Sequence, residues 1–159
     1  MNPSQLPSRP LVLGIGNILL GDEGVGVHAI RRLEARGLGA HLDLVDGGTG
    51  GFHLLEFFTG RPQLILIDAA ADDQALGTVS RLQPRFASDF PRTLTAHDIG
   101  LKDLLESAAL LGDLPSMDLI TVSVAAHQPM ALELSLSVAA ALEQIEKLVR
   151  LCCSGREAP

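Results

Sequence analysis

The chain has 159 residues, a formal net charge of -7, and neither Trp nor Tyr. A chain of this length forms one domain that buries enough surface to fold without disulfides. An acidic chain without these aromatics lacks the basic surface and the stacking platforms of nucleic-acid binders, so we expect no nucleic-acid partner.

In chain order, the predicted elements alternate between strands and helices. Apolar runs predict five strands, of which the fourth is short and near an edge: residues 11–15, 42–45, 63–67, 77–82 and 118–124. Apolar residues at helical spacing predict helices, one of them very short: residues 22–36, 52–58, 101–111 and 138–152. This alternation indicates an α/β fold with a largely parallel central sheet of about five strands that helices cover on both faces.

The predicted domain organisation is simple. Residues 1–10 are polar and Pro-rich and form a flexible N-terminal tail, residues 11–152 form a single α/β catalytic domain, and residues 153–159 form a flexible C-terminal tail. No apolar run approaches the ~20 residues of a membrane span, so we expect no membrane contact. Cys152 and Cys153 are adjacent, which suits neither a disulfide nor a chelate, and a chain without disulfides is typical of the cytoplasm.

Three polar residues follow directly on predicted strands. Asn17, Asp46 and Asp68 each stand where an apolar run ends. Ligands of parallel α/β sheets bind beyond the carboxyl ends of the strands, so these side chains should share one edge.

The first loop, GIGNILLGDEGVG, resembles two nucleotide-binding motifs imperfectly. Gly14 and Gly16 begin a dinucleotide fingerprint, but Leu19 occupies the position of its third glycine. Asp22 and Glu23 stand where a P-loop has Lys and Ser/Thr, and two carboxylates repel phosphate and attract a cation. Asp22 is well placed as a helix N-cap, which leaves Glu23 as the candidate metal ligand.

His97 is the histidine best suited to bind a metal. It lies in TLTAHDIGL at the start of a predicted helix, where the helix dipole favours a neutral imidazole. His28, His41 and His53 fall on helix faces or a strand approach, and His127 before Pro129 stays open. The sequence holds no G-x-S-x-G, H-E-x-x-H or Cys-His pair, so hydrolysis would depend on carboxylates, one His and a metal.

Four blocks together resemble the maturation endopeptidases of [NiFe] hydrogenases: GIGNILLGDEGVG, VDGGTGG, LILIDA and LTAHDIGL, over about residues 11 to 150. The resemblance implies a three-layer α/β/α fold with a twisted central sheet. It also implies that Glu23, Asp68 and His97 are the catalytic and metal-contacting residues. It implies no permanent cofactor, because nickel is supplied by the substrate, although Ni²⁺ or a surrogate divalent ion would bind weakly. The implied partner is the hydrogenase large-subunit precursor, whose C-terminal extension is removed after nickel insertion.

The resemblance also suggests a substrate cleft formed by Asn17, Asp46, Gly47 and Gly48. Two alternatives stay open. One is a non-catalytic nickel-delivery or metal-sensing module that uses the same three residues, and the other is a metal-dependent hydrolase of a different peptide or amide on the same fold. A cleavage assay on the precursor separates them.

Overall fold

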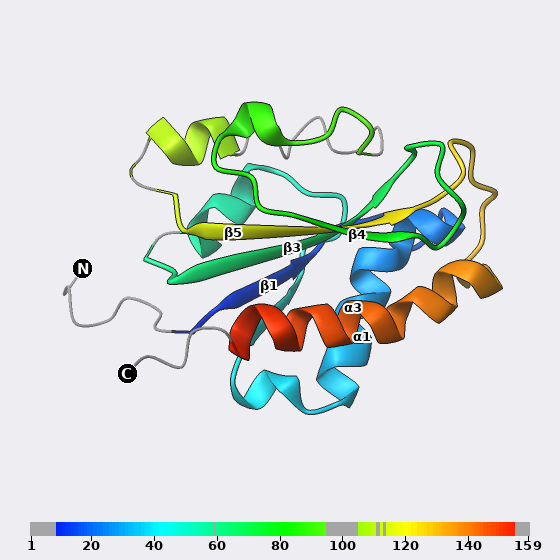
Figure 1. Ribbon diagram of the computed structural model, residues 1–159, viewed down its shortest axis with the longest axis horizontal. Helices are drawn as coiled ribbons and strands as arrows, with labels where there is room; N and C mark the ends of the chain where they lie inside the picture. Colours follow the sequence, from blue (N-terminus) through cyan, green and yellow to red (C-terminus); the bar gives the residue numbers. More distant parts are fainter. Residues whose placement is uncertain (1–8, 59, 95–104, 111, 113, 155–159) are drawn as a thin grey trace.

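The computed structural model describes residues 9–58, 60–94, 105–110, 112 and 114–154. At its centre is a five-stranded sheet in the order β2-β1-β3-β5-β4 (Figure 1). The strands are β1 Leu11–Gly14, β2 Asp43–Asp46, β3 Gln63–Ala70, β4 Val79–Leu82 and β5 Ser116–Ser123. All neighbouring pairs are parallel except β4 and β5, which are antiparallel. The predicted, largely parallel sheet and the edge position of its fourth strand are therefore confirmed.

Helical segments cover both faces of the sheet. One face carries α1 Val25–Ala35 and α3 Leu136–Ser154, which lie against each other (Figure 1). The other face carries the 3-10 helix η4 Phe52–Phe57 and the helical residues 105–110. Shorter 3-10 turns are η2 Gly21–Gly24, η3 Leu38–Ala40 and η5 Ala87–Asp89. The architecture is therefore the predicted three-layer α/β/α fold.

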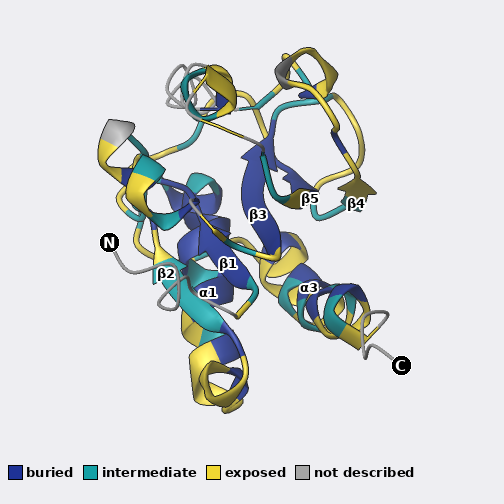
Figure 2. Cartoon of the chain, turned by 90° about the vertical axis from the view of Figure 1, so that its left-hand side faces the viewer, coloured by how far each residue is buried: buried dark blue, intermediate teal, exposed yellow. Residues whose placement is uncertain are grey.

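The two central strands are buried on both faces because their side chains alternate between two apolar clusters. Val12 and Ile65 point into the cluster beneath α1 and α3, whereas Leu13 and Leu66 point into the cluster beneath η4. Figure 2 shows β1 and β3 fully buried between the layers, while β2 and β4 are more exposed at the edges. Each fully buried Leu or Ile contributes about 1.5–3 kcal/mol, so β1 and β3 form a rigid frame.

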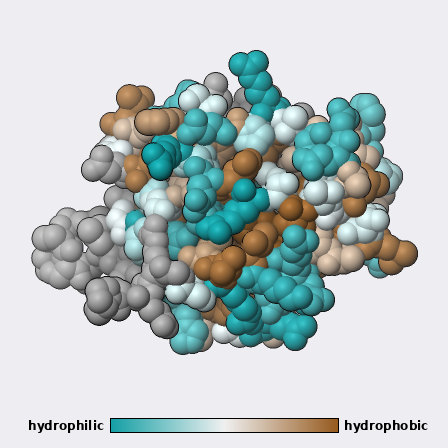
Figure 3. Space-filling view, viewed as in Figure 1, coloured by the Kyte–Doolittle hydropathy of each residue, from teal (hydrophilic) through white to brown (hydrophobic). Residues whose placement is uncertain are grey.

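Apolar side chains also reach the surface where α3 meets the sheet. Figure 3 shows them gathered along that line with polar side chains around them. The partly buried residues on this side include Val79, Leu142 and Leu148, which pack against the cluster beneath α1 and α3. Within the described part of the chain, no helix combines the length and apolarity needed to cross a membrane.

The two cysteines lie in the last turns of α3 and are free. Burial, with a contribution from nearby Asp118, raises the pKa of the Cys152 thiol to about 11. Burial likewise raises the pKa of Cys153. Since the thiolate is the reactive form, both thiols are poor nucleophiles at neutral pH.

The helix predicted from Asp22 begins differently in the structure. Residues 21–24 form η2, and α1 starts at Val25 with Gly24 as its N-cap and no capping side chain. The interpretation of Asp22 as an N-cap is therefore wrong. Its buried carboxylate instead accepts hydrogen bonds from the Ser135 backbone N–H (2.7 Å) and from Ser135 Oγ (2.8 Å). Asp22 thus ties the first loop to the start of α3.

The connection order creates a switch point between β1 and β3. The chain leaves β1 and forms β2 on one side of it, then returns to form β3 on the other side. The two connections therefore diverge between β1 and β3. In open α/β sheets, the crevice beyond the carboxyl ends of the strands at such a point is where ligands bind.

Candidate functional site

Glu23 lies in η2, the first helical turn after β1, beyond the carboxyl edge of the sheet, and it is half-buried. Gly16 fixes its position: a Cβ on Gly16 would lie 2.0 Å from the Glu23 carbonyl oxygen, and the φ of Gly16 is +152°. Only glycine tolerates both conditions. The first loop therefore presses against the backbone of Glu23 and holds it at the switch point.

Asp68 is fully buried within β3 rather than just after it. The predicted strand ends at Ile67, but β3 continues to Ala70 because β5 pairs with it as far as Ser123. Alternation places the Asp68 side chain on the face of Leu64 and Leu66, beneath η4. Its Oδ1 accepts the backbone N–H of Ala69 at 2.7 Å.

Two buried polar residues of β5 extend the polar region around Asp68. Thr121 pairs with Asp68 and Ser123 with Ala70, so both side chains lie on the Asp68 face of the sheet. Ser123 Oγ has no hydrogen-bond partner among the described residues. Neither residue was predicted from the sequence, although the polar positions alternating with Ile120 and Val122 are a signal for them.

His97 lies outside the described residues. The last described residues before it are tied to the end of β3: Ala71 N–H donates to the Thr93 carbonyl (2.8 Å), and Leu94 forms an antiparallel bridge with Ala70. Because the pairing is antiparallel, the chain at Leu94 runs back along β3 in the direction of Asp68.

The four predicted cleft residues lie on the same carboxyl edge. Asp46 ends β2 and is exposed, and its Oδ1 accepts the Gly48 N–H at 2.9 Å. Gly47 N–H donates to the Gly14 carbonyl (2.8 Å), and the Gly48 carbonyl accepts Gly16 N–H (2.7 Å). Asn17 Oδ1 accepts the Leu19 N–H at 2.9 Å, which closes a tight turn in the first loop. The structure thus joins the loops after β1 and β2 backbone to backbone.

The loop after β5 is also attached to the first loop, and no sequence motif indicates this. Gly21 N–H donates to the Ala131 carbonyl (2.8 Å), Ala131 N–H donates to the Leu19 carbonyl (3.0 Å), and Leu20 pairs with Ala131. Asp22 N–H donates to Gln128 Oε1 at 3.3 Å. These partners are about 110 residues apart, so no local pattern can reveal them. Together they stiffen the segment that carries Glu23.

Of the remaining histidines, only His28 is substantially enclosed. His41, His53 and His127 are exposed. The His28 imidazole donates to the Leu132 carbonyl, and its Nε2 is buried without a hydrogen-bond partner among the described residues. Burial, followed by the nearby charge of Arg31, lowers the pKa of His28, while the bond to Leu132 partly opposes that shift.

We expect His28 to make the fold sensitive to mild acid. When the folded pKa is lowered, the unfolded chain binds the proton first, so stability falls as pH drops below about 6.5. Above that pH both states are neutral and the contribution vanishes. Urea unfolding at pH 7.5 and 5.5 should show a smaller loss of stability for His28→Gln than for the wild type, with His41→Gln as the exposed control. Equal losses in His28→Gln and the wild type would contradict the assignment.

Within the described residues, no three His, Cys, Asp or Glu side chains are grouped so that they could hold a metal ion. Of the three candidate ligands, Glu23 and Asp68 are among the described residues, whereas His97 is not. The described part of the site is therefore a carboxylate region, with Glu23 after β1 and Asp68 in β3. Such a region attracts a cation and disfavours a phosphate.

A family model for hydrogenase maturation proteases, called HycI, matches residues 27–151, which is well over half of the chain. The chain belongs to the hydrogenase maturation protease family.

Individual members of this family are similar over most of the chain. Hydrogenase 2 maturation protease of Escherichia coli K12 is 35% identical over 157 residues, which cover 94% of each protein. Hydrogenase expression/formation protein HupD of Rhodobacter capsulatus is 36% identical over 134 residues; the match covers 82% of this chain but only 62% of HupD. Among solved structures, the hydrogenase maturating endopeptidase HybD of E. coli superimposes with a TM-score of 0.82 at 30% identity, over 94% of both chains.

Proposed function

We propose that this member of the maturation protease family is the endopeptidase that removes the C-terminal extension of a [NiFe] hydrogenase large-subunit precursor after nickel insertion. The observation that supports this most directly is the placement of two carboxylates, Glu23 and Asp68, at the β1/β3 switch point. That is the ligand-binding position of an open α/β sheet.

In this proposal, Glu23, Asp68 and His97 recognise the nickel that the precursor carries. Two carboxylates and one imidazole suit a borderline divalent ion, and three protein ligands leave positions open for substrate and water. The direction of the chain at Leu94 supports the inclusion of His97.

The chemistry of the cut follows from the burial of Asp68. Burying a carboxylate costs free energy, which an incoming cation offsets. An ion held between Glu23, Asp68 and the precursor would orient the scissile peptide and polarise its carbonyl group for attack by water. The ion belongs to the substrate, so we propose no permanent cofactor and only weak binding of Ni²⁺ or Zn²⁺ by the free protein.

The remaining edge residues would form the substrate cleft. Asn17, Asp46, Gly47 and Gly48 belong to loops that are bonded to one another beside Glu23. We infer that their backbone groups and the exposed Asp46 hold the precursor's tail. The two free, poorly reactive thiols are compatible with the reducing cytoplasm, which is where we propose that processing occurs.

Comparing nickel-loaded with nickel-free precursor tests this function. Mass spectrometry should show that the loaded precursor is shortened at its C-terminus and that the empty precursor stays intact, because the ion positions the scissile bond. Free Ni²⁺ added to the protease should not restore cleavage of a precursor that cannot hold nickel. Equal cleavage of both forms would refute nickel recognition. No cleavage of either form would support the nickel-delivery alternative.

A further inference from the structure

The outer edge of β2 is open for pairing. β2 is an edge strand of the sheet, and no described residue pairs with its outer side. On its inner side, Asp43 N–H donates to the Pro10 carbonyl (3.0 Å) and Gly47 N–H donates to the Gly14 carbonyl (2.8 Å). Alternate residues of a parallel strand bond to the same neighbour. Leu44 and Asp46 therefore direct their N–H and C=O groups outward.

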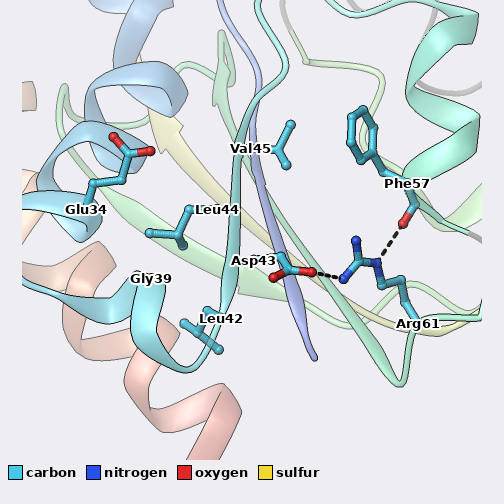
Figure 4. A pocket seen from close by; sticks show the side chains of 8 residues that line it. All are labelled: Glu34, Gly39, Leu42, Asp43, Leu44, Val45, Phe57 and Arg61. Carbon is cyan, nitrogen blue, oxygen red and sulfur yellow. Dashed lines mark hydrogen bonds and ion pairs between the residues drawn. The ribbon is translucent and has the colours of Figure 1, made fainter. Parts of the chain in front are cut away.

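A groove of about 420 Å³ follows this edge (Figure 4). One wall is formed by the end of α1, the segment before β2 and one face of β2. The other wall is formed by the end of η4, the turn after it and the opposite face of β2. The lining residues are, for the first wall, Glu34, Gly39, Leu42 and Leu44, and for the second, Asp43, Val45, Phe57 and Arg61. The edge of β2 lies between the two walls, so the groove has room for one extended chain beside the strand.

The second wall is held in place by Arg61. Its side chain is only 8% exposed, its Nε donates to the Phe57 carbonyl (3.0 Å), and its Nη1 forms an ion pair with the Asp43 carboxylate. Figure 4 shows the guanidinium between η4 and β2. Because these bonds fix the end of η4 to β2, the groove exists before any ligand arrives, which lowers the entropic cost of binding.

The groove leads to the candidate active site. At its carboxyl end lies Asp46, whose side chain bonds to Gly48, and the Gly48 carbonyl accepts the Gly16 N–H. Gly16 in turn lies against the backbone of Glu23. A peptide paired with β2 therefore reaches the Glu23 and Asp68 edge within a few residues, at about 3.3 Å per residue.

We propose that the outer edge of β2 binds an extended segment of the precursor, next to the scissile bond, as an added strand of the sheet. This rests on the proposed function, because the site at the end of the groove is taken as the place of cleavage. Backbone hydrogen bonds to Leu44 and Asp46 supply the binding, and the apolar parts of the walls take alternate side chains. A second copy of this chain fits poorly, because a four-residue edge offers far less than the ~1,200 Å² of a stable interface.

Amide hydrogen exchange tests the added strand residue by residue. The probe is a nickel-free synthetic peptide that spans the cleavage site of the precursor, because pairing with backbone groups requires no ion. Saturating peptide should slow exchange at Leu44 and Asp46 at least tenfold, whereas Asp43, Val45 and Gly47 should change little, since their amides face β1. Absence of peptide binding at millimolar concentration, or binding without slowed exchange at Leu44 and Asp46, would overturn the proposal. If these amides already exchange slowly in the protein alone, and still more slowly at higher protein concentration, the edge binds a second copy of the chain.

A matched pair of substitutions isolates the outward hydrogen bond. Leu44→Pro removes the outward N–H without breaking the β1 ladder, and proline is tolerated on edge strands. Leu44→Ala removes the same side chain but keeps the N–H. Peptide affinity should be about 3–10-fold lower for the proline variant than for the alanine variant, because that is the contribution of one hydrogen bond to binding. Equal affinity would contradict the proposal, and if the proline variant fails to fold, the exchange measurement decides alone.

This experiment is independent of the test of nickel-dependent cleavage. Cleavage of the nickel-loaded precursor without peptide binding at the edge would leave the protease function standing and remove this inference. If the peptide protects the edge amides but no precursor is cleaved, the edge inference stands and the protease function is refuted.

Discussion

Asp68→Asn should abolish cleavage of nickel-loaded precursor while leaving the fold intact. The substitution keeps the volume of the side chain, and the amide oxygen can still accept the Ala69 N–H that Oδ1 accepts now. It removes the negative charge that contacts the substrate's ion in the proposed mechanism. Removing one such electrostatic contact typically costs at least about 100-fold in rate. The rate of C-terminal processing and the melting temperature of the variant give the two readings.

Asp118→Asn provides the matched control, because Asp118 is a second buried aspartate in the same sheet. It pairs with Ile65 near the amino end of β3, and its carboxylate accepts hydrogen bonds from Arg81 (2.9 Å) and Gln63 (2.8 Å). Losing the charge there weakens the bond to Arg81 and should cost about 1–3 kcal/mol of stability. Cleavage by the folded Asp118→Asn protein should remain near the wild-type rate. Normal cleavage by Asp68→Asn would eliminate Asp68 from the site.

Gly26→Ala should destabilise the fold strongly although it adds only one methyl group. A Cβ on Gly26 would lie 2.2 Å from the Ile15 carbonyl oxygen and 2.5 Å from that of Ile67, so α1 must move away from the sheet. Helix propensity alone predicts the opposite sign, because alanine is favoured over glycine by up to about 1 kcal/mol within a helix. We expect a net loss of about 2–3 kcal/mol, as in overpacked cores. Cleavage should fall as well, because η2 and Glu23 precede α1 directly.

Gly39→Ala is the control for added volume. The nearest atom to a Cβ on Gly39 is Leu44 Cδ1 at 3.9 Å, which is an ordinary contact. Its stability, measured by urea unfolding, should stay within about 0.5 kcal/mol of the wild type or rise slightly. Similar urea midpoints for both variants would show that α1 does not pack against the sheet as closely as the structure indicates.

Local sequence patterns were sufficient to predict the strands of the sheet and to identify the blocks at its carboxyl edge. The apolar runs LVLG and QLILI have no exposed face, and a run of this kind forms a central strand covered on both sides. The GIGNILLGDEGVG and LILIDA blocks indicated Glu23 and Asp68 because carboxylates among glycines or after an apolar strand stand out locally. The spacing of apolar residues indicates which side of an element is buried, and a few neighbouring residues are enough to show it.

Which elements become neighbours depends on tertiary contacts that the local patterns do not contain. The same alternation of strands and helices is compatible with several strand orders. The order β2-β1-β3 is the one that places the switch point between β1, which Glu23 follows, and β3, which carries Asp68. The bond from Ser135 to Asp22 replaced the predicted N-cap because a partner 113 residues away competes for the same carboxylate. Likewise, β2 became an edge with an open groove because no described segment pairs with its outer side. These outcomes depend on contacts between residues distant in sequence, which no local pattern of side chains contains.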